Sequence, residues 1–461
     1  MKRLLLFIAA IAIAGKVSAQ TCNCETEFTY IKNFMEQNYA GFKDKQAQMT
    51  KPKYDKLVAQ YRAFTKLPNA PEKCLLIINQ FLAKFKDHHV AIRMNFDAAK
   101  LDSAYMAQRE IIPVSDEKIA ELRKSTGFEG IYDFHDAAKY KIAVMKDKTE
   151  LHDYIAVIVS SNLPGWKKGM IKWEGKMVSD SLAAGALYML NGKPKPETFY
   201  FGKDAIWGDW HRENTKPARS SGKWEPVASR KLSDKTLYLK ISSFEAYNAK
   251  NIDSVVKANA EALKTTPNLV LDLRDNGGGS DYTYGPLMQY VYTNPVKQTG
   301  ASLLSTDANI KGWAAKLDDE ERSEENKNSL RATVKLLEAN KGKWVVNSPD
   351  GVINNFTKLP YPQKIVILVN KNVASSTEQF LLFARQSSKV TLMGENTSGT
   401  LDYSNWVEAP FSCMPYILRY STSRSRRLDK GEGIDATGIK PDKYLKPGEN
   451  WIQKAQEALE R

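Results

Sequence analysis

The sequence predicts an α/β fold in its second half, preceded by a helical domain and a β-rich middle domain. Three patterns along the 461 residues support this division. Apolar residues recur at helical spacing as far as about residue 94, and short alternating runs bounded by turn residues occupy 95–227. From residue 228 onward strands alternate with helices, which is typical of parallel βαβ units.

Residues 1–19 predict a cleaved secretory signal peptide. A basic start, MKR, is followed by an apolar stretch over 4–14 and by small residues up to Ala19, where a signal peptidase would cut. The stretch is short for a membrane span, and the residues before Cys22 do not form a lipoprotein pattern. We therefore expect an exported protein, periplasmic or secreted, without stable membrane insertion.

Residues 20–94 predict the small helical domain. Its apolar periodicity is clearest in three segments, FTYIKNFMEQNY, YDKLVAQYRAF and CLLIINQFLAKF. The chain has four cysteines, and three of them, Cys22, Cys24 and Cys74, lie in this region. In an oxidising compartment a bridge from Cys22 or Cys24 to Cys74 would pin the mature N-terminus to a nearby helix, but spacing alone does not choose the pairing.

Residues 95–227 predict a compact β-rich domain, similar to a small barrel. Short strand-like runs are separated by turn residues: GIYDF, KYKIAVM, DYIAVIVSS, GMIKWEG, GALYML and ETFYF. In residues 228–461 the segments TLYLKISSF, IDSVVKANAEAL, NLVLDL and YGPLMQYVY alternate between strand and helix patterns. A charged helical insertion near 305–345 precedes the strands KIVILVN and KVTLMGE. No fixed period suggests a repeat protein.

Charge and motifs exclude several classes of function. The formal charge is +14, or +11 without the three basic residues of the signal peptide, but the lysines are spread along the chain. The only dense basic cluster is RYSTSRSRR at 419–427, and no nucleic-acid motif is present, so we expect no nucleic-acid partner. HExxH, phosphate-loop and dinucleotide motifs are also missing, which predicts that no metal or organic cofactor is needed.

Two turns stand out in the α/β region. The segment DLRDNGGG (272–279) ends an apolar strand in three glycines, which permit positive φ and let backbone N–H groups approach a ligand. The segment VASSTEQF (373–380) places two serines at the start of a helix, where Ser375 and Glu378 fit a capping box. Purely structural roles would explain both segments: the glycines would form a tight turn, and Ser375 would cap a helix. A helix N-terminus also favours the negative charge that develops after nucleophilic attack.

Together these turns resemble the tail-specific (C-terminal processing) and tricorn-like serine peptidases. The similarity covers, in the family's order, LYLKISSF, LVLDLRDNGGG, ILVNKNVASSTEQF, LMGENTSGT and GIDATGIKPD. The resemblance implies a crotonase-like (ClpP/crotonase) α/β core that acts on peptide or protein substrates. It also implies that Ser375 is the nucleophile, with Ser376 as the alternative register. Backbone N–H groups of Gly277 or Gly278 and of Ser376 would form the oxyanion hole.

A serine nucleophile needs a base. Thr400 occupies the place of the lysine that the tail-specific branch uses, so a serine–lysine dyad is not expected. The tricorn-like branch uses a histidine in a segment similar to L-x-D-x-H, which FLAKFKDHHVAI resembles. Asp87 and His89 take the matching positions, and His89 is therefore our predicted base. The family has a serine before this histidine, where this chain has His88.

The resemblance also implies an acid that orients His89. In the segment GIDATGIKPD this residue would be Asp435, with Glu432 as the nearby substitute. The middle region lacks a persuasive loop for binding a substrate's terminal carboxylate. We therefore do not expect this chain to share the tail-specific branch's preference for C-terminal tails. Two alternatives stay open: an inactive member of the fold that binds peptides or glycans in the cell envelope, and a basic envelope protein that binds anionic polymer through 419–427. The sequence does not indicate an oligomeric state.

Overall fold

The computed structural model describes residues 22–98, 100–107, 109–134, 139–202, 204–206, 210–215, 226–320, 322–435, 437–446 and 448–461. The predicted signal peptide, residues 1–19, lies outside this range. Within the described residues, none of the helices is both long enough and apolar enough to cross a membrane.

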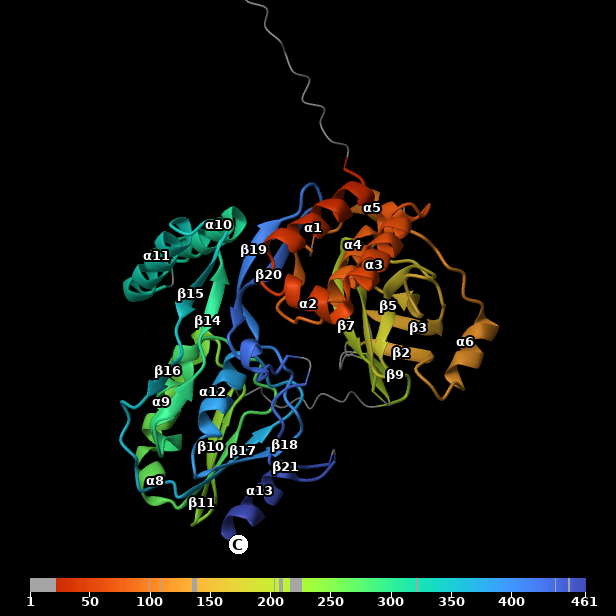
Figure 1. Cartoon of the computed structure of the whole chain (residues 1–461). Helices are drawn as coiled ribbons and strands as arrows, with labels where there is room; N and C mark the ends of the chain where they lie inside the picture. Colours follow the sequence, from red (N-terminus) through yellow and green to blue (C-terminus); the bar gives the residue numbers. More distant parts are fainter. Residues whose placement is uncertain are drawn as a thin grey trace, which may run out of the picture.

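Four helices form the N-terminal region: α1 (Cys24–Asn38), α2 (Phe42–Met49), α3 (Lys51–Phe64) and α4 (Ala70–Ala83). Helix α1 begins where the Asn23 side chain accepts a hydrogen bond from the Thr26 N–H at 2.9 Å, a typical N-cap. In Figure 1 helices α1 and α2 lie beside strands β19 and β20, although hundreds of residues separate them in the sequence. The helices are therefore not an isolated unit.

The helices share one hydrophobic core with a sheet whose strands come from widely separated parts of the sequence. Buried side chains of α1 and α4, such as Phe28 and Phe81, belong to the same cluster as Tyr403 and Tyr420. Five strands form this sheet: β1 (Ala91–Met94), β14 (Ala301–Leu304), β15 (Trp344–Ser348), β19 (Tyr403–Pro410) and β20 (Tyr416–Ser425). Strand β1 follows the helices directly and pairs antiparallel with β20. Two segments more than 300 residues apart thus pair in one sheet.

Two disulfides reinforce this junction. Cys24 on α1 is bonded to Cys74 on α4, which is one of the two pairings that the sequence left open. Cys22 is bonded to Cys413, in the turn between β19 and β20. The first bridge fixes α1 against α4, and the second fixes the start of the described chain to the distant hairpin.

The middle region is an eight-stranded antiparallel sheet in the order β7-β6-β5-β4-β3-β2-β9-β8. Its strands are β2 (Gly130–Phe134), β3 (Tyr140–Lys146), β4 (Tyr154–Ser161), β5 (Ile171–Ser179), β6 (Leu182–Tyr188), β7 (Pro194–Tyr200), β8 (Ala205–Ile206) and β9 (Trp210–Arg212). A bridge from Phe201, just after β7, to Ile206 in β8 brings the two edges of the sheet together. Helices α5 (Ser103–Ala107) and α6 (Asp116–Arg123) precede the strands.

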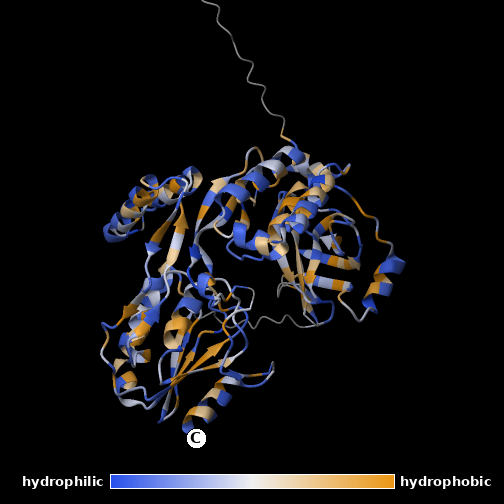
Figure 2. Ribbon diagram, in the orientation of Figure 1, coloured by the Kyte–Doolittle hydropathy of each residue, from blue (hydrophilic) through white to orange (hydrophobic). Residues whose placement is uncertain are grey.

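The α/β region is built on a six-stranded sheet in the order β10-β11-β12-β17-β18-β21. These strands are β10 (Val227–Ser233), β11 (Thr236–Ile241), β12 (Asn268–Asp272), β17 (Lys364–Val369), β18 (Val390–Gly394) and β21 (Lys443–Tyr444). All neighbours pair in parallel except β10 with β11. Figure 2 shows that the central strands of this sheet are strongly hydrophobic, as expected for strands covered on both faces.

Helices cover the two faces of this sheet. On one face lie α7 (Ala249–Ala258), α8 (Ala260–Thr265), α9 (Gly285–Val291) and α12 (Ser376–Ala384), and on the other lies α13 (Trp451–Glu460). Short 3₁₀ helices η1 (Ala246–Asn248) and η2 (Asp281–Tyr284) precede α7 and α9. The charged insertion folds as α10 (Asp307–Ala315), η3 (Lys316–Asp318) and α11 (Glu324–Glu338). Strands β13 (Val296–Gln298) and β16 (Gly351–Ile353) pair beside it, and η4 (Leu428–Lys430) follows β20.

Candidate active site

Ser375 stands at the turn between β17 and α12, in a backbone conformation that non-glycine residues rarely adopt. Its φ is +55° and its ψ is −125°. It forms the predicted capping box with Glu378, whose Oε2 accepts a hydrogen bond from the Ser375 N–H at 3.1 Å. Such strained conformations are concentrated at functional sites, where the surrounding structure maintains them.

The buried Glu378 carboxylate also fixes a neighbouring loop. It accepts hydrogen bonds from the N–H groups of Gly399 and Thr400 at 2.7 and 2.8 Å and from the Thr397 hydroxyl at 2.5 Å. The four hydrogen bonds to Glu378 therefore join the Ser375 turn to residues 397–400, which form one wall of the site.

The glycine turn packs directly against the Ser375 turn. Gly278 has φ +94°, and a Cβ added to it would lie 2.8 Å from both the Ser375 Cβ and the Ala374 carbonyl oxygen. Glycine is therefore required there for conformation and for space. Buried Asn276 ties the two turns together, because its Oδ1 accepts from the Gly278 N–H at 3.0 Å and from the Thr377 hydroxyl at 2.7 Å. Asn276 belongs to the segment DLRDNGGG, but nothing in that segment alone indicates this role.

Among the backbone N–H groups at these turns, those of Gly277, Gly279 and Ser376 have no hydrogen-bond acceptor in the described part of the chain. The Gly278 N–H is already bonded to Asn276, so of our two glycine candidates Gly277 has the available donor. Gly277 also faces open space. The hydroxyl of Ser376 points elsewhere and donates to the Gly279 carbonyl at 2.9 Å.

His89 lies between the end of α4 and the start of β1. Its Nδ1 is 2.7 Å from the Tyr403 carbonyl oxygen and 3.8 Å from Asp87 Oδ1. The carboxylate of Asp87 is buried and accepts hydrogen bonds from Tyr39, from Ser421 and from the His89 N–H at 2.9, 3.1 and 2.8 Å. Because a carbonyl can only accept, Nδ1 carries the hydrogen, and Nε2 of the neutral ring is an acceptor.

Ser375 and His89 line the same cleft, which has a volume of about 1190 Å³. Gly277, Thr400 and His88 also line it. His88 Nδ1 is 3.3 Å from the Ser398 hydroxyl, and burial lowers the pKa of His88. The far wall comes from the helical insertion, through Asp319, Arg322, Ser323, Glu325 and Asn326. The structure thus gathers into one cleft residues that lie far apart in the sequence.

The contact that we predicted between Asp435 and His89 is not present: no hydrogen bond joins these two described side chains. Asp435 Oδ1 instead accepts from the backbone N–H groups of Leu401 and Asp402 at 3.0 and 2.8 Å. Burial, followed by the charges of Asp402 and Asp87, raises the pKa of Asp435 to about 7. Asp435 Oδ2 also lies 4.0 Å from the Lys45 ammonium, so the contacts of Asp435 are with the loop and with α2.

This raised pKa predicts a pH dependence of stability. The native state holds the Asp435 proton more tightly than the unfolded chain, whose aspartates titrate near 4. The stabilisation that this bound proton gives the native state is therefore complete below about pH 4 and is lost as the pH rises through about 7. We expect Asp435→Asn to gain about 2–4 kcal/mol relative to the wild type between pH 5 and 8, as measured by urea unfolding. Parallel pH curves for the two proteins would contradict this prediction.

Residues 235–445 match the model of peptidase family S41. The matched segment is a little less than half of the chain. Its residues include both turns of the candidate site, and the match confirms the predicted similarity to tail-specific and tricorn-like peptidases. The protein is a serine-type peptidase with peptide or protein substrates. Among curated protein sequences, none matches this chain.

The matched segment also lies within a longer fold that this chain shares with a solved structure. Mature CPAF is similar to this chain with a TM-score of 0.50, at 12% identity and with 95% of each chain covered. A putative peptidase from Parabacteroides merdae is similar at 14% identity and TM-score 0.43, covering 94% of this chain and 93% of its own. The photosystem II D1 C-terminal processing protease has 12% identity and TM-score 0.41, with 95% and 98% covered. The likeness to CPAF shows a shared fold that combines helical and β-rich regions.

Proposed function

We propose that the protein is an exported serine peptidase in which Ser375 is the nucleophile and His89 is the general base. The observation that carries this proposal is the convergence on one cleft of Ser375, His89 and the Gly277 N–H. A helix N-terminus, a strained serine and a histidine with a defined tautomer together provide what acyl transfer requires.

The proposed reaction begins when His89 Nε2 removes the Ser375 hydroxyl proton as Oγ attacks the peptide carbonyl carbon. The Gly277 and Ser376 N–H groups, which have no acceptor within the described residues, would hold the resulting oxyanion. His89 then gives the proton to the leaving nitrogen, and the amine half departs. Water attacks the acyl-enzyme by the same proton transfers in reverse, which regenerates Ser375.

Asp87 is proposed in place of Asp435 as the acid that supports His89. Nδ1 of His89 donates to the Tyr403 carbonyl, which fixes the tautomer, while the carboxylate of Asp87 lies 3.8 Å from the same atom. A buried negative charge at that distance stabilises the imidazolium that forms during attack. Asp87 was visible in the D-x-H pattern, but the Tyr403 carbonyl has no signature in the sequence.

We expect Asp87→Asn to lower kcat/KM by about 10- to 100-fold, since about 1.4–2.8 kcal/mol of imidazolium stabilisation would be lost. The acid limb of the pH profile should move to lower pH. Ser421→Ala is the matched control, because it removes a hydrogen bond to Asp87 without removing the charge. A loss of activity with no movement of the acid limb would assign Asp87 a structural role only.

Several coarser features belong to the same proposal. We infer that the α/β region is a crotonase-like core, which the largely parallel sheet with α7, α9 and α12 on one face supports. The domain limits 20–94, 95–227 and 228–461, signal-peptide removal after Ala19 and a periplasmic or secreted location are also proposed. Two disulfides support export, because such bonds persist in oxidising compartments.

The proposal is tested by two measurements on the wild-type protein. Mass spectrometry of a diverse peptide mixture should reveal cleavage products, and an alkyl fluorophosphonate should leave its adduct on the tryptic peptide that contains Ser375. Cleavage and labelling must both be lost when His89 is replaced by glutamine. An unmodified Ser375 together with an uncut mixture would overturn the assignment and favour the inactive peptide- or glycan-binding alternative.

A further inference from the structure

The basic segment 419–427 contains four arginines, and the fold uses three of them. These three form ion pairs with aspartates at 2.6 to 3.7 Å: Arg424 with Asp44 and Asp429, Arg426 with Asp350, and Arg427 with Asp402. The fourth, Arg419, lies 4.0 Å from Glu408, and the same Glu408 oxygen already accepts a hydrogen bond from Arg93 at 2.9 Å. The segment is therefore not a continuous basic surface, and the charge of Arg419 is only partly neutralised.

Stacking fixes the Arg419 guanidinium against an aromatic ring. Its central carbon lies 3.9 Å from the centroid of the Trp406 ring. Nε of Arg419 is buried and has no hydrogen-bond partner among the described residues. Burial, followed by the charge of Arg93, lowers the pKa of Arg419. The charges of Glu408 and Glu245 oppose this decrease of the pKa. A cation that is partly buried and incompletely hydrogen-bonded gains more from a bound carboxylate than an exposed cation does.

Arg419 and His89 line the same large cleft. Along β20, Arg419 precedes Ser421 by two residues, so the two side chains point to the same face of the strand, about 7 Å apart. The Ser421 hydroxyl donates to Asp87 at 3.1 Å. On the neighbouring strand β1, the residue opposite Arg419 is Ala91, which follows His89 by two residues. Arg419 therefore lies on the histidine side of this cleft.

The proposed reaction brings the amine half of a substrate to this side. His89 protonates the leaving nitrogen, so the residues that follow the scissile bond start beside His89. An extended peptide advances about 3.3 Å per residue. The first three of these residues therefore span about 10 Å, which is enough to bring one of their side chains to Arg419.

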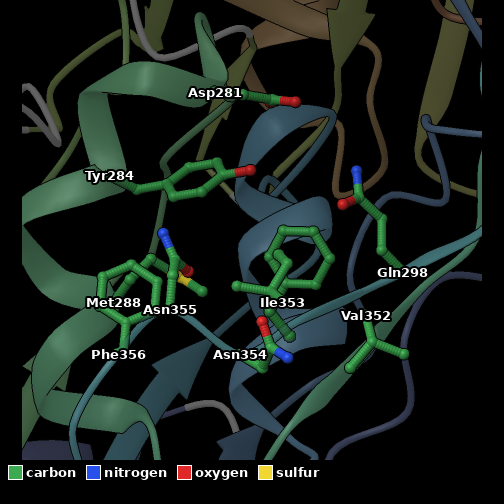
Figure 3. A pocket seen from close by; sticks show the side chains of 10 residues that line it. Asp281, Tyr284, Met288, Gln298, Val352, Ile353, Asn354, Asn355 and Phe356 are labelled. Atoms are coloured by element: carbon green, nitrogen blue, oxygen red, sulfur yellow. The ribbon is translucent and has the colours of Figure 1, made fainter.

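A second cavity, of about 500 Å³, lies beside α12 and has a different lining. Figure 3 shows polar side chains in its walls: Asp281, Gln298, Asn354 and Asn355. None of the described residues that line it is a lysine or an arginine. The large cleft is lined by three such residues: Lys250, Arg322 and Arg419. Lys250 is exposed, and Arg322 pairs with Asp319 at 3.0 Å. Among these cations, Arg419 is therefore the best suited to hold a carboxylate.

We propose that Arg419 binds an acidic side chain of the substrate, aspartate or glutamate, within the first three residues on the amine side of the scissile bond. The inference rests on the proposed function and adds the substrate class. The carboxylate forms two charge-assisted hydrogen bonds with the edge of the guanidinium, while the face of the guanidinium stays on the Trp406 ring.

The test compares peptides with amidated C-termini that carry glutamate, glutamine or lysine at one of the first three positions after the cleaved bond. We expect glutamate to exceed glutamine in kcat/KM by about tenfold or more at one of these positions, because hydrogen bonds between charged groups are the stronger class. Lysine should fall below glutamine, and added salt should lower the glutamate-to-glutamine ratio.

Variants assign this preference to one side chain. Arg419→Gln should bring the glutamate-to-glutamine ratio to within about twofold of unity. Arg322→Gln is the matched control, because it removes the same charge from the far wall of the same cleft and should keep the ratio. Glu408→Gln removes the acid that lies 4.0 Å from Arg419, so the ratio should rise. If Arg419→Gln does not fold, a ratio that stays constant or falls in Glu408→Gln contradicts the proposal.

The possible failures are distinguishable. If the fluorophosphonate labels Ser375 and peptides are cleaved, but the glutamate preference is absent, persists in Arg419→Gln or is lost in Arg322→Gln, the inference is wrong and the peptidase assignment stands. A preference that appears only for peptides with a free terminal carboxylate would show that Arg419 binds the end of the chain, and would also overturn the inference. If neither labelling nor cleavage occurs, the proposed function fails and the role of Arg419 fails with it.

Discussion

Ser375→Ala should abolish most peptide cleavage, with a loss of at least about 10³-fold in kcat/KM. The reason is that the variant has no nucleophile, while the oxyanion donors and the cleft remain. Ser376→Ala should keep activity within about tenfold, because its side chain makes a structural hydrogen bond to Gly279 and only its backbone N–H takes part in the proposed reaction. Steady-state kinetics on one cleaved peptide would measure both effects.

The same position offers a check on backbone strain. Alanine at residue 375 keeps the conformational free-energy cost of a positive φ, because it has a Cβ. Glycine adopts φ +55° without this cost. We therefore expect Ser375→Gly to unfold at a higher urea concentration than Ser375→Ala, by about 1 kcal/mol in free energy. If Ser376→Ala is the inactive variant and Ser375→Ala cleaves normally, the register of the nucleophile is shifted by one residue.

Lys73→Met should produce the largest loss of stability, about 3–5 kcal/mol. Lys73 on α4 lies 2.7 and 2.9 Å from the two carboxylate oxygens of Glu174 on β5, and both side chains are almost fully buried. Burial alone would raise the pKa of Glu174, but the hydrogen bond with His152 and the charge of Lys73 hold it at about 2, so the carboxylate stays charged inside the protein. Removing the lysine leaves a buried charge, with His152 and Tyr188 as its remaining partners.

The matched control is the double variant Lys73→Met/Glu174→Gln, which removes both charges. We expect it to recover at least about half of the lost free energy of unfolding, because the penalty comes mainly from the unpaired carboxylate. Urea unfolding at pH 7 gives both values. If the double variant is less stable than Lys73→Met, the carboxylate is useful to the fold without its lysine, and the argument from burial is wrong.

Local patterns in the sequence predicted the local structure well. The six quoted runs of the middle region are strands β2 to β7, and the two conspicuous turns lie against each other. The five-stranded sheet was not predicted, because β1 pairs with a strand more than 300 residues away and carries no sign of its partner. Short strands in a long chain have many possible partners, and tertiary packing decides among them.

The candidate site shows the same division between local and distant information. Ser375, Glu378 and the glycines belong to short motifs whose geometry follows from sequence order. The orientation of His89 depends on the Tyr403 carbonyl, a backbone group that any residue could provide. Asp435 was chosen from a motif, but its hydrogen bonds go to the backbone of Leu401 and Asp402. Motifs therefore predicted which residues line the cleft better than they predicted the contacts that hold those residues.

The pairing of β1 with β20 also sets the order in which an active enzyme can form. His89 precedes β1 by two residues, while its supports, Tyr403 and the partner of Asp87, Ser421, lie on β19 and β20. A ribosome must therefore complete almost the whole chain before the base can be positioned, and contacts this distant in sequence form late in folding. The Cys22–Cys413 bond then closes the same junction covalently. The proposed site is therefore complete only after residues 403–421 have been made.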